Sequence, residues 1–196
     1  MSPPSEVSSP VRAREDALPE YSAEERSLLL QIAHEAILSL LEGRDVSLFT
    51  PSAHLAEPRG VFTTLYLNTH LRGCVGYPTA LLPLYRAVME TARAAAFDDP
   101  RFLPLKAEEA SAIKVSLSVL SPVRPISPEE IGVGRHGLLI WEGQRRGLLL
   151  PQVAIEHGWD AVTFLEQTCR KAGLPPNAWR GDAKLEAFTA EVFGEI

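Results

Sequence analysis

The chain has 196 residues, of which 45% are hydrophobic and 22% charged, and its formal net charge at pH 7 is −6. The acidic balance, without a segregated basic patch, argues against a nucleic-acid partner. The longest apolar runs, GLLLP and TALLPLY, are far shorter than the ~20 residues of a membrane-spanning helix, and the first residues do not resemble a secretory signal peptide. We therefore expect a cytoplasmic protein without a membrane partner.

The amino-terminal part predicts a tail followed by a helix. Residues 1–20 are rich in Pro, Ser and charges without apolar periodicity, which is typical of a disordered segment. Ser22 and Glu25 have the spacing of a capping box, and Gly43 is the expected terminator. The predicted buried stripe consists of Leu29, Ile32, Ala33, Ala36, Ile37 and Leu40.

The next segment predicts a β-hairpin. Two β-prone runs, GVFTTLYLN and LRGCVGY, bracket the tripeptide NTH, which we expect to connect them. If residues 70–75 form a regular strand, His70, Arg72 and Cys74 share one face. Leu71 and Val75 then point to the other face, toward the core.

The hairpin is followed by a helix and a fixed turn. LYRAVMETARAAAF has helical periodicity and many alanines, so this helix can lie close against a sheet. Pro100 disfavours helical geometry at the preceding residue. Asp99, Arg101 and Phe102 are therefore expected in a turn.

The rest of the chain predicts strands and two helices. AIKVSLSVLSP alternates as a half-buried strand, and RHGLLIWEGQRRGLLLP indicates a hairpin whose turn contains Glu142 and Gly143. PQVAIEHG and DAVTFLEQTCRKAGLP favour helices, with Cys169 at a core position of the second, and KLEAFTAEVFGEI favours one more strand. These elements indicate an α+β fold, and the Pro-rich bend over 122–129 could divide it into two subdomains.

Cys74 is the first candidate for chemistry. A neighbouring Arg72 would favour the thiolate, while Gly73 and Gly76 leave the backbone open to a ligand and offer N–H groups to a developing negative charge. The alternative is that Cys74 is a small buried residue in a tight hairpin, with Arg72 paired to an acid.

Three other side chains are candidates. Asp99 and Arg101 could orient a substrate, or Arg101 could tie down a loop. His136, between glycines in VGRHGLLI, could act as an acid, a base or a ligand, or be structural. No spacing typical of a metal site or a cofactor fingerprint is present, so we predict neither a metal nor a cofactor.

Several motifs occur in an order that resembles the AMMECR family, also called AmmeMemoRadiSam system protein A. They are LRGCVGY, AFDDPRFLPL, VSLSVLSP, VGRHGLLI, GLLLPQVAIEHGWD and FLEQTCRKAGLP, and the similarity covers about residues 22 to 196. The family's signature hexapeptide usually has isoleucine where this chain has Val75. The resemblance implies one domain over 21–196, with mixed or antiparallel sheets, flanking helices, and a larger and a smaller subdomain with a cleft between them.

The resemblance also implies where to look for a function. It singles out Arg72, Gly73, Cys74 and Gly76, then Asp99, Arg101 and Phe102, then His136 and Gly137. It implies partnership with a Memo-type protein, related in fold to non-haem iron dioxygenases, and with a radical S-adenosylmethionine enzyme. No reaction is assigned to the family.

Two hypotheses follow. In the first, the protein is a small cleft enzyme in which Cys74 reacts, Arg72 activates it, Asp99 or His136 handles protons, and Arg101, Gly73 and Gly76 hold a small anionic substrate. In the second, it is a non-catalytic accessory subunit that docks to the two partners.

Overall fold

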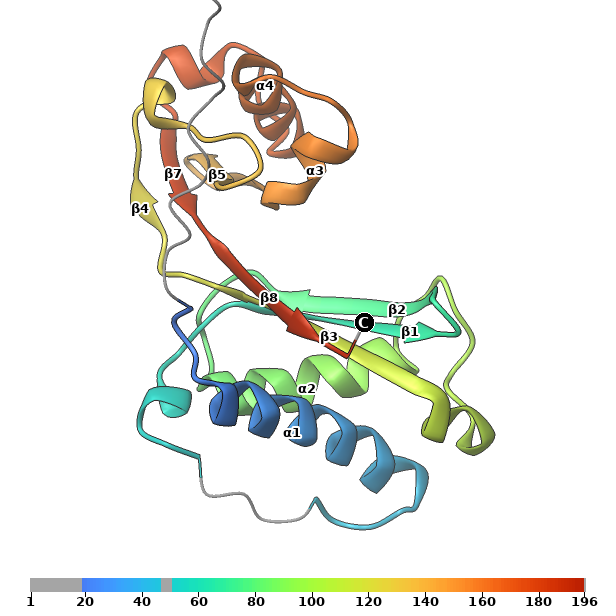
Figure 1. The fold of residues 1–196 in the computed structure, drawn as a ribbon. Helices are drawn as coiled ribbons and strands as arrows, with labels where there is room; N and C mark the ends of the chain where they lie inside the picture. Colours follow the sequence, from blue (N-terminus) through green and yellow to red (C-terminus); the bar gives the residue numbers. More distant parts are fainter. Residues whose placement is uncertain (1–18, 47–50, 196) are drawn as a thin grey trace, which may run out of the picture.

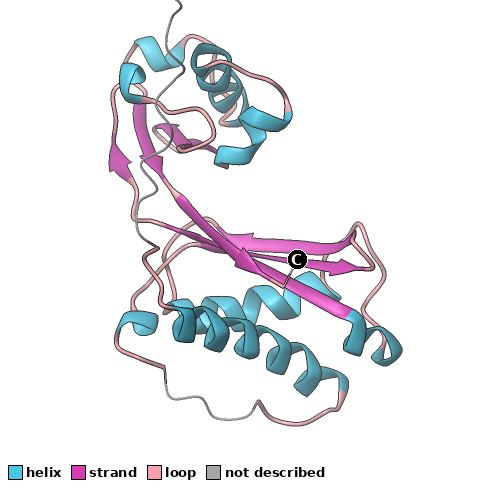
Figure 2. Cartoon of the chain, in the orientation of Figure 1, coloured by secondary structure: helices cyan, strands magenta, loops and turns pink. Residues whose placement is uncertain are grey.

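Two antiparallel sheets flanked by helices make up the protein, as Figures 1 and 2 show. The computed structural model describes residues 19–46 and 51–195. Each sheet has four strands, in the orders β2-β1-β3-β8 and β4-β7-β5-β6. The α+β class predicted from the sequence is therefore confirmed.

The first sheet is covered on one face by α1 (Ala23–Leu41) and α2 (Leu84–Phe97), which lie side by side beneath it in Figure 1. The sheet consists of β1 (Val61–Leu67), β2 (His70–Tyr77), β3 (Ile113–Leu120) and β8 (Ala190–Gly194). Its alternating residues give it one apolar face, which the apolar stripes of the two helices cover.

The predicted capping box at the start of α1 is confirmed, because Ser22 accepts from the Glu25 N–H and Glu25 from the Ser22 N–H. The predicted stripe is wrong at its last position. Leu40 is 50% exposed, whereas the helix buries Ser39 and satisfies its hydroxyl with the Ala36 carbonyl. The helix therefore turns Leu40 away from the core, whereas Leu41 packs against it.

The hairpin of β1 and β2 is confirmed, with Asn68 and Thr69 as its turn. Both turn residues have positive φ, 49° and 70°, as a tight turn between twisted strands requires. The predicted regular alternation along β2 is wrong, because Tyr66 pairs with Leu71 and Leu65 with Gly73. This β-bulge leaves an extra residue in β2.

The bulge changes the faces of the second strand. Because Leu65 is fully buried and Tyr66 is the next residue, Leu71 lies opposite a residue of the outer face, and it is 42% exposed. Leu71 therefore does not point to the core as the regular strand predicted. Val75, by contrast, packs against the first core as expected.

The second sheet carries its own hydrophobic core. It consists of β4 (Arg124–Pro125), β5 (Gly137–Glu142), β6 (Arg145–Leu149) and β7 (Lys184–Phe188). The predicted helices are α3 (Pro151–Glu156) and α4 (Ala161–Lys171). Cys169 is fully buried in this core, and the β5–β6 connection is Gly143 and Gln144, one residue later than the sequence suggested.

The carboxy-terminal segment is two strands in two sheets, not one. β7 pairs with β5, whereas β8 continues beyond Thr189 and pairs with β3. Thr189 exchanges hydrogen bonds with Ser121, which fixes the crossing point. The break interrupts the apolar alternation of this segment, since the consecutive residues Ala187 and Phe188 are both buried.

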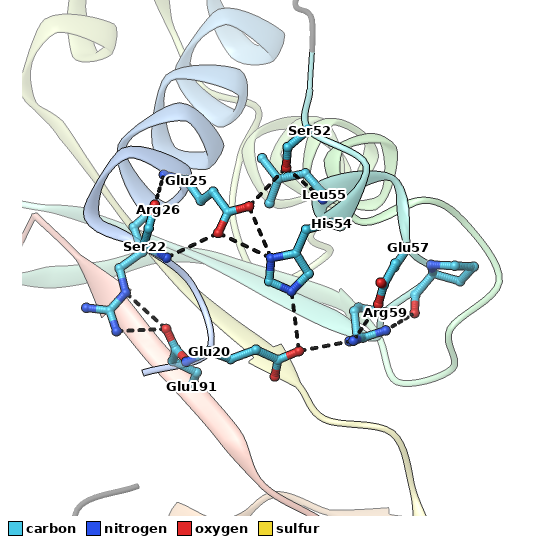
Figure 3. A network of polar contacts seen from close by, with 11 residues as sticks. Glu20, Ser22, Glu25, Arg26, Ser52, His54, Leu55, Glu57, Arg59 and Glu191 are labelled. Atoms are coloured by element: carbon cyan, nitrogen blue, oxygen red, sulfur yellow. Dashed lines mark hydrogen bonds and ion pairs between the residues drawn. The ribbon is translucent and has the colours of Figure 1, made fainter. Parts of the chain in front are cut away.

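A polar network anchors the start of the described chain (Figure 3). The Glu20 N–H donates to Glu191 at 2.7 Å, and Arg26 pairs with the same carboxylate at 2.8 Å. His54 lies between Glu25 and Glu20. Glu20, at the end of the predicted tail, is thus held, whereas residues 1–18 of that tail lie outside the described residues.

In the described part of the chain, no helix combines the length and apolarity that a membrane crossing would require.

Candidate functional site

Cys74 lies in β2, the edge strand of the first sheet, opposite Thr64. Thr63 and Leu65 are fully buried toward the helices, so Thr64 and its cross-strand partner Cys74 belong to the face that the helices leave open. The thiol is half-buried, and the Thr64 hydroxyl donates to its sulfur at 3.3 Å. The sulfur is therefore partly accessible and already carries one hydrogen bond.

Asp99 binds the backbone of this edge strand. Its carboxylate is 4% exposed and accepts from the Cys74 N–H at 2.8 Å. It also accepts from the Arg101 backbone at 3.1 Å and from the Arg101 guanidinium at 2.9 and 2.7 Å. The Arg101 guanidinium and these N–H donors hold the pKa of the Asp99 carboxyl well below its usual range.

Arg101 completes the same arrangement, because its guanidinium donates to the Cys74 carbonyl at 3.2 Å. Asp99 accepts from the N–H of Cys74 while Arg101 donates to its C=O. These are the two bonds that a further strand would make at an open sheet edge. The turn predicted at Asp99 and Arg101 thus closes the edge of the sheet at the signature cysteine.

Arg72 forms a two-point ion pair with Glu109, at 2.9 and 3.0 Å, and donates to the Pro104 carbonyl at 3.4 Å. Bonding to Arg72 lowers the pKa of Glu109 to about 2. Within residues 19–46 and 51–195, no hydrogen bond joins the Arg72 guanidinium to the Cys74 sulfur. Arg72 therefore holds the segment after Arg101 against β2.

The two glycines of the motif allow close packing. A Cβ on Gly73 would lie 2.0 Å from the Ala95 carbonyl oxygen of α2, and one on Gly76 would lie 2.2 Å from the Phe62 ring. Gly73 lets the helix approach the strand, and Gly76 lets the aromatic ring lie across it.

His136 belongs to the other half of the molecule, immediately before β5. It is 4% exposed, and its Nδ1 accepts from the Gly132 N–H at 3.1 Å. Burial, followed by the charges of Arg135 and Arg124, lowers the pKa of the imidazole. Among the described residues, no hydrogen bond connects this imidazole with Cys74 or Asp99.

The predicted site residues are thus only partly brought together. Cys74, Asp99 and Arg101 are in direct contact, and Arg72 lies on the same strand but bonds to Glu109. His70, outside the motif, is exposed and bonds to the Asn68 carbonyl. In the described part of the chain, His, Cys, Asp and Glu side chains form no group of three that could hold a metal ion.

A second feature has lining residues that were not predicted as site residues from the sequence. A cavity of about 730 Å³ is lined by residues of both sheets, including Phe62, Leu139 and Arg146, and by Lys171 at the end of α4. Its lining comes from short segments between residues 58 and 171. No local sequence motif marks such a site, because only the packing of the two sheets assembles it.

Comparison with known proteins agrees with the motifs. The family model described as AMMECR1 matches residues 30–193. Protein MK0488 of Methanopyrus kandleri is 44% identical over 184 residues, covering 88% of this chain and 89% of that protein. Protein PF1979 of Pyrococcus furiosus is 45% identical over 185 residues, covering 85% of this chain and 86% of that protein.

A solved structure is also similar. The crystal structure of the uncharacterized protein PH0010 from Pyrococcus horikoshii superposes with a TM-score of 0.74 and 42% identity, over 88% of this chain and 92% of that one. The match in sequence motifs, family model and fold shows that the chain belongs to the AMMECR1 family.

Proposed function

We propose that this protein is a cytoplasmic, non-catalytic accessory subunit in which the signature motif holds a protein-binding turn. The observation that carries the proposal is the bonding of Asp99 and Arg101 to the backbone of Cys74. In the enzyme hypothesis, Asp99 would transfer protons, Arg72 would activate the thiol, and Arg101 would hold the substrate. Here each of them already has a protein partner.

The anchored turn exposes an apolar side chain. Leu103, between Arg101 and the Pro104 carbonyl that Arg72 binds, is 79% exposed. Leu71 on the bulged strand β2 is 42% exposed. Exposed apolar side chains held on a fixed backbone support protein docking, because little entropy is lost when the partner binds.

The Memo-type protein and the radical S-adenosylmethionine enzyme are the partners that the family resemblance suggests. The exposed side chain of Leu103 would serve as the apolar anchor in the contact with one of them.

The test is co-purification of these two proteins with variants of this chain. Leu103→Asp should remove the partner, because a carboxylate cannot enter an apolar pocket without a hydrogen-bond donor. Leu81→Asp is the matched control, since Leu81 is 78% exposed in another loop. Equal retention of the partner by both variants would exclude the turn as the docking surface.

The enzyme hypothesis keeps one supporting observation. The Cys74 sulfur is half-buried on the open face of the sheet and accepts from the Thr64 hydroxyl. If Cys74→Ser abolished turnover by the assembled system while the complex stayed intact, Cys74 would carry chemistry and the accessory role would be incomplete.

A further inference from the structure

An apolar cavity of about 730 Å³ lies between the two sheets, and its size matches that of small-molecule sites, which commonly measure ~300–1,000 Å³. Its apolar walls come from both sheets and from α3. They include Phe62, Leu120, Leu139, Leu148, Leu149 and Val153. Walls of this kind can bury the hydrocarbon or aromatic part of a ligand.

The charges of the lining all have one sign. Among the described residues, the lining contains Arg59, Arg146 and Lys171 but no Asp or Glu. The chain as a whole has 25 acidic and 19 basic residues, so its composition alone would not predict an entirely cationic lining. A cavity of this kind is complementary to an anion.

One of the three cations is already paired. Arg59 contacts Glu20 at 3.0 Å and Glu57 at 2.8 Å, as Figure 3 shows. Within residues 19–46 and 51–195, no ion pair joins Arg146 or Lys171 to a carboxylate. Arg146 and Lys171 are therefore the charges available to a ligand.

Close packing brings the backbone segments that carry these two cations together. A Cβ on Gly147 would lie 2.3 Å from the Ala172 backbone nitrogen, so β6 lies directly against the end of α4. Arg146 precedes Gly147, and Lys171 precedes Ala172. Both cations line the cavity, Arg146 from the strand and Lys171 from the end of the helix.

We propose that this cavity binds an amphipathic anion. Its hydrocarbon or aromatic body lies against the apolar walls, and its carboxylate or phosphate bonds to Arg146 and Lys171. The guanidinium can hold two oxygens at once, and the ammonium supplies a second charge. This site uses none of the polar groups of the signature motif, so it is independent of the proposed docking function.

The test is isothermal titration calorimetry of the full chain with decanoate below its micelle range. Decanol and inorganic phosphate are comparison ligands that represent the apolar body and the anionic head separately. Saturable binding of decanoate is expected, with each comparison ligand bound at least about tenfold more weakly. Decanol bound as tightly as decanoate, or phosphate bound as tightly, would overturn the proposal.

Variants locate the site. Arg146→Gln and Lys171→Gln should each raise the Kd for decanoate about five- to tenfold, because each removes one charged partner of the head group. Arg145→Gln is the matched control, since Arg145 is the neighbouring cation on β6 and does not line the cavity. It should leave the Kd within about twofold.

A filling variant tests the cavity itself. Ala80 lines the cavity from an exposed loop, so Ala80→Trp can occupy the space with little disturbance of the fold. Binding of decanoate should be lost, while the circular dichroism spectrum stays unchanged. Unchanged binding in Ala80→Trp, or an equal effect of the Arg145 and Arg146 substitutions, would show that decanoate binds elsewhere and overturn the proposal.

Discussion

Replacing Asp99 by asparagine tests the role of the signature motif most sharply. The substitution keeps the shape of the side chain but replaces one carboxylate oxygen, either Oδ2 or Oδ1, by an NH2 group. Both oxygens accept hydrogen bonds from N–H donors in the native protein. In the native protein, Oδ2 accepts from the Cys74 N–H at 2.8 Å and from the Arg101 guanidinium at 2.7 Å. If the NH2 group takes the Oδ2 position, both bonds are lost; if it takes the Oδ1 position, the two bonds from Arg101 to Oδ1 are lost. In either orientation a donor then faces two donors.

The expected loss of stability in Asp99→Asn depends on how exposed its two hydrogen-bond donors, Arg101 and Cys74, are. The Arg101 side chain is 56% exposed, so solvent screens its ion pair and its loss costs no more than ~1 kcal/mol. The bond from the Cys74 N–H to a buried carboxylate is charge-assisted, and its loss costs roughly 1.5–3 kcal/mol. We expect Asp99→Asn to lower the free energy of unfolding by about 3 kcal/mol at pH 7.

The pH dependence has a definite sign. Because the folded-state pKa of Asp99 lies below its usual value of 3.8, its carboxylate stabilises the protein above that value, and the contribution is lost as the pH falls further. The difference between the wild-type chain and Asp99→Asn should therefore be full at pH 7 and shrink below about pH 4.

The assay is urea unfolding followed by circular dichroism, together with hydrogen exchange of the Cys74 amide. Asp98→Asn is the control, because Asp98 is the exposed neighbour. The assigned role of Asp99 would be refuted by two results together: free energies of unfolding of Asp99→Asn and Asp98→Asn that agree within about 0.5 kcal/mol, and unchanged protection of the Cys74 amide from hydrogen exchange in Asp99→Asn.

Three further results are expected. Gly73→Ala should lower the free energy of unfolding in urea by about 3 kcal/mol or more, because its Cβ would lie 2.0 Å from the Ala95 carbonyl oxygen of α2. Gly181→Ala should be near neutral, because its Cβ would lie 3.6 Å from the nearest atom. Equal losses of stability in the two variants would contradict the close packing at Gly73. Glu109→Gln should lower the free energy of unfolding by about 1 kcal/mol at neutral pH. The difference in stability from the wild-type chain should shrink as the pH falls from 4.5 toward 2, where the folded-state pKa of Glu109 lies. A difference in stability that does not depend on pH would rule out the ion pair with Arg72. Iodoacetamide should label Cys74 in the native protein but Cys169 only after unfolding, because Cys169 is fully buried and burial raises the pKa of its thiol. Mass spectrometry identifies the labelled cysteine, and labelling of Cys169 in the native protein would contradict its place in the core.

Much of the fold could be predicted because local signals and tertiary packing agree. The capping box at Ser22 and the alternation over residues 113–119 each have a single interpretation, and both occur in the structure. The turn at Asp99 could also be anticipated, since Pro100 excludes a helix there. These features depend on residues close together in the sequence.

The features that were missed depend on distant residues. The bulge beside Leu71 is set by pairing with β1, and the division of the last strand at Thr189 is set by Ser121. The residues that bond to the motif could not be identified from the sequence either, because nothing near Arg72 indicates that Glu109 will pair with it. The lining residues of the cavity could not be predicted for the same reason, because they lie far apart in the sequence and come together only when the two sheets pack.

The most direct test of the account separates the sulfur of Cys74 from its backbone. Asp99→Asn keeps the thiol and releases the backbone, whereas Cys74→Ser removes the thiol and keeps the backbone bonds. We would measure the affinity of the partner that co-purifies with the wild-type chain for both variants. The account predicts that Asp99→Asn weakens binding at least about tenfold and that Cys74→Ser stays within about twofold of the wild-type chain. Weakening by Cys74→Ser alone would show that the sulfur, not the anchored turn, is what the partner requires.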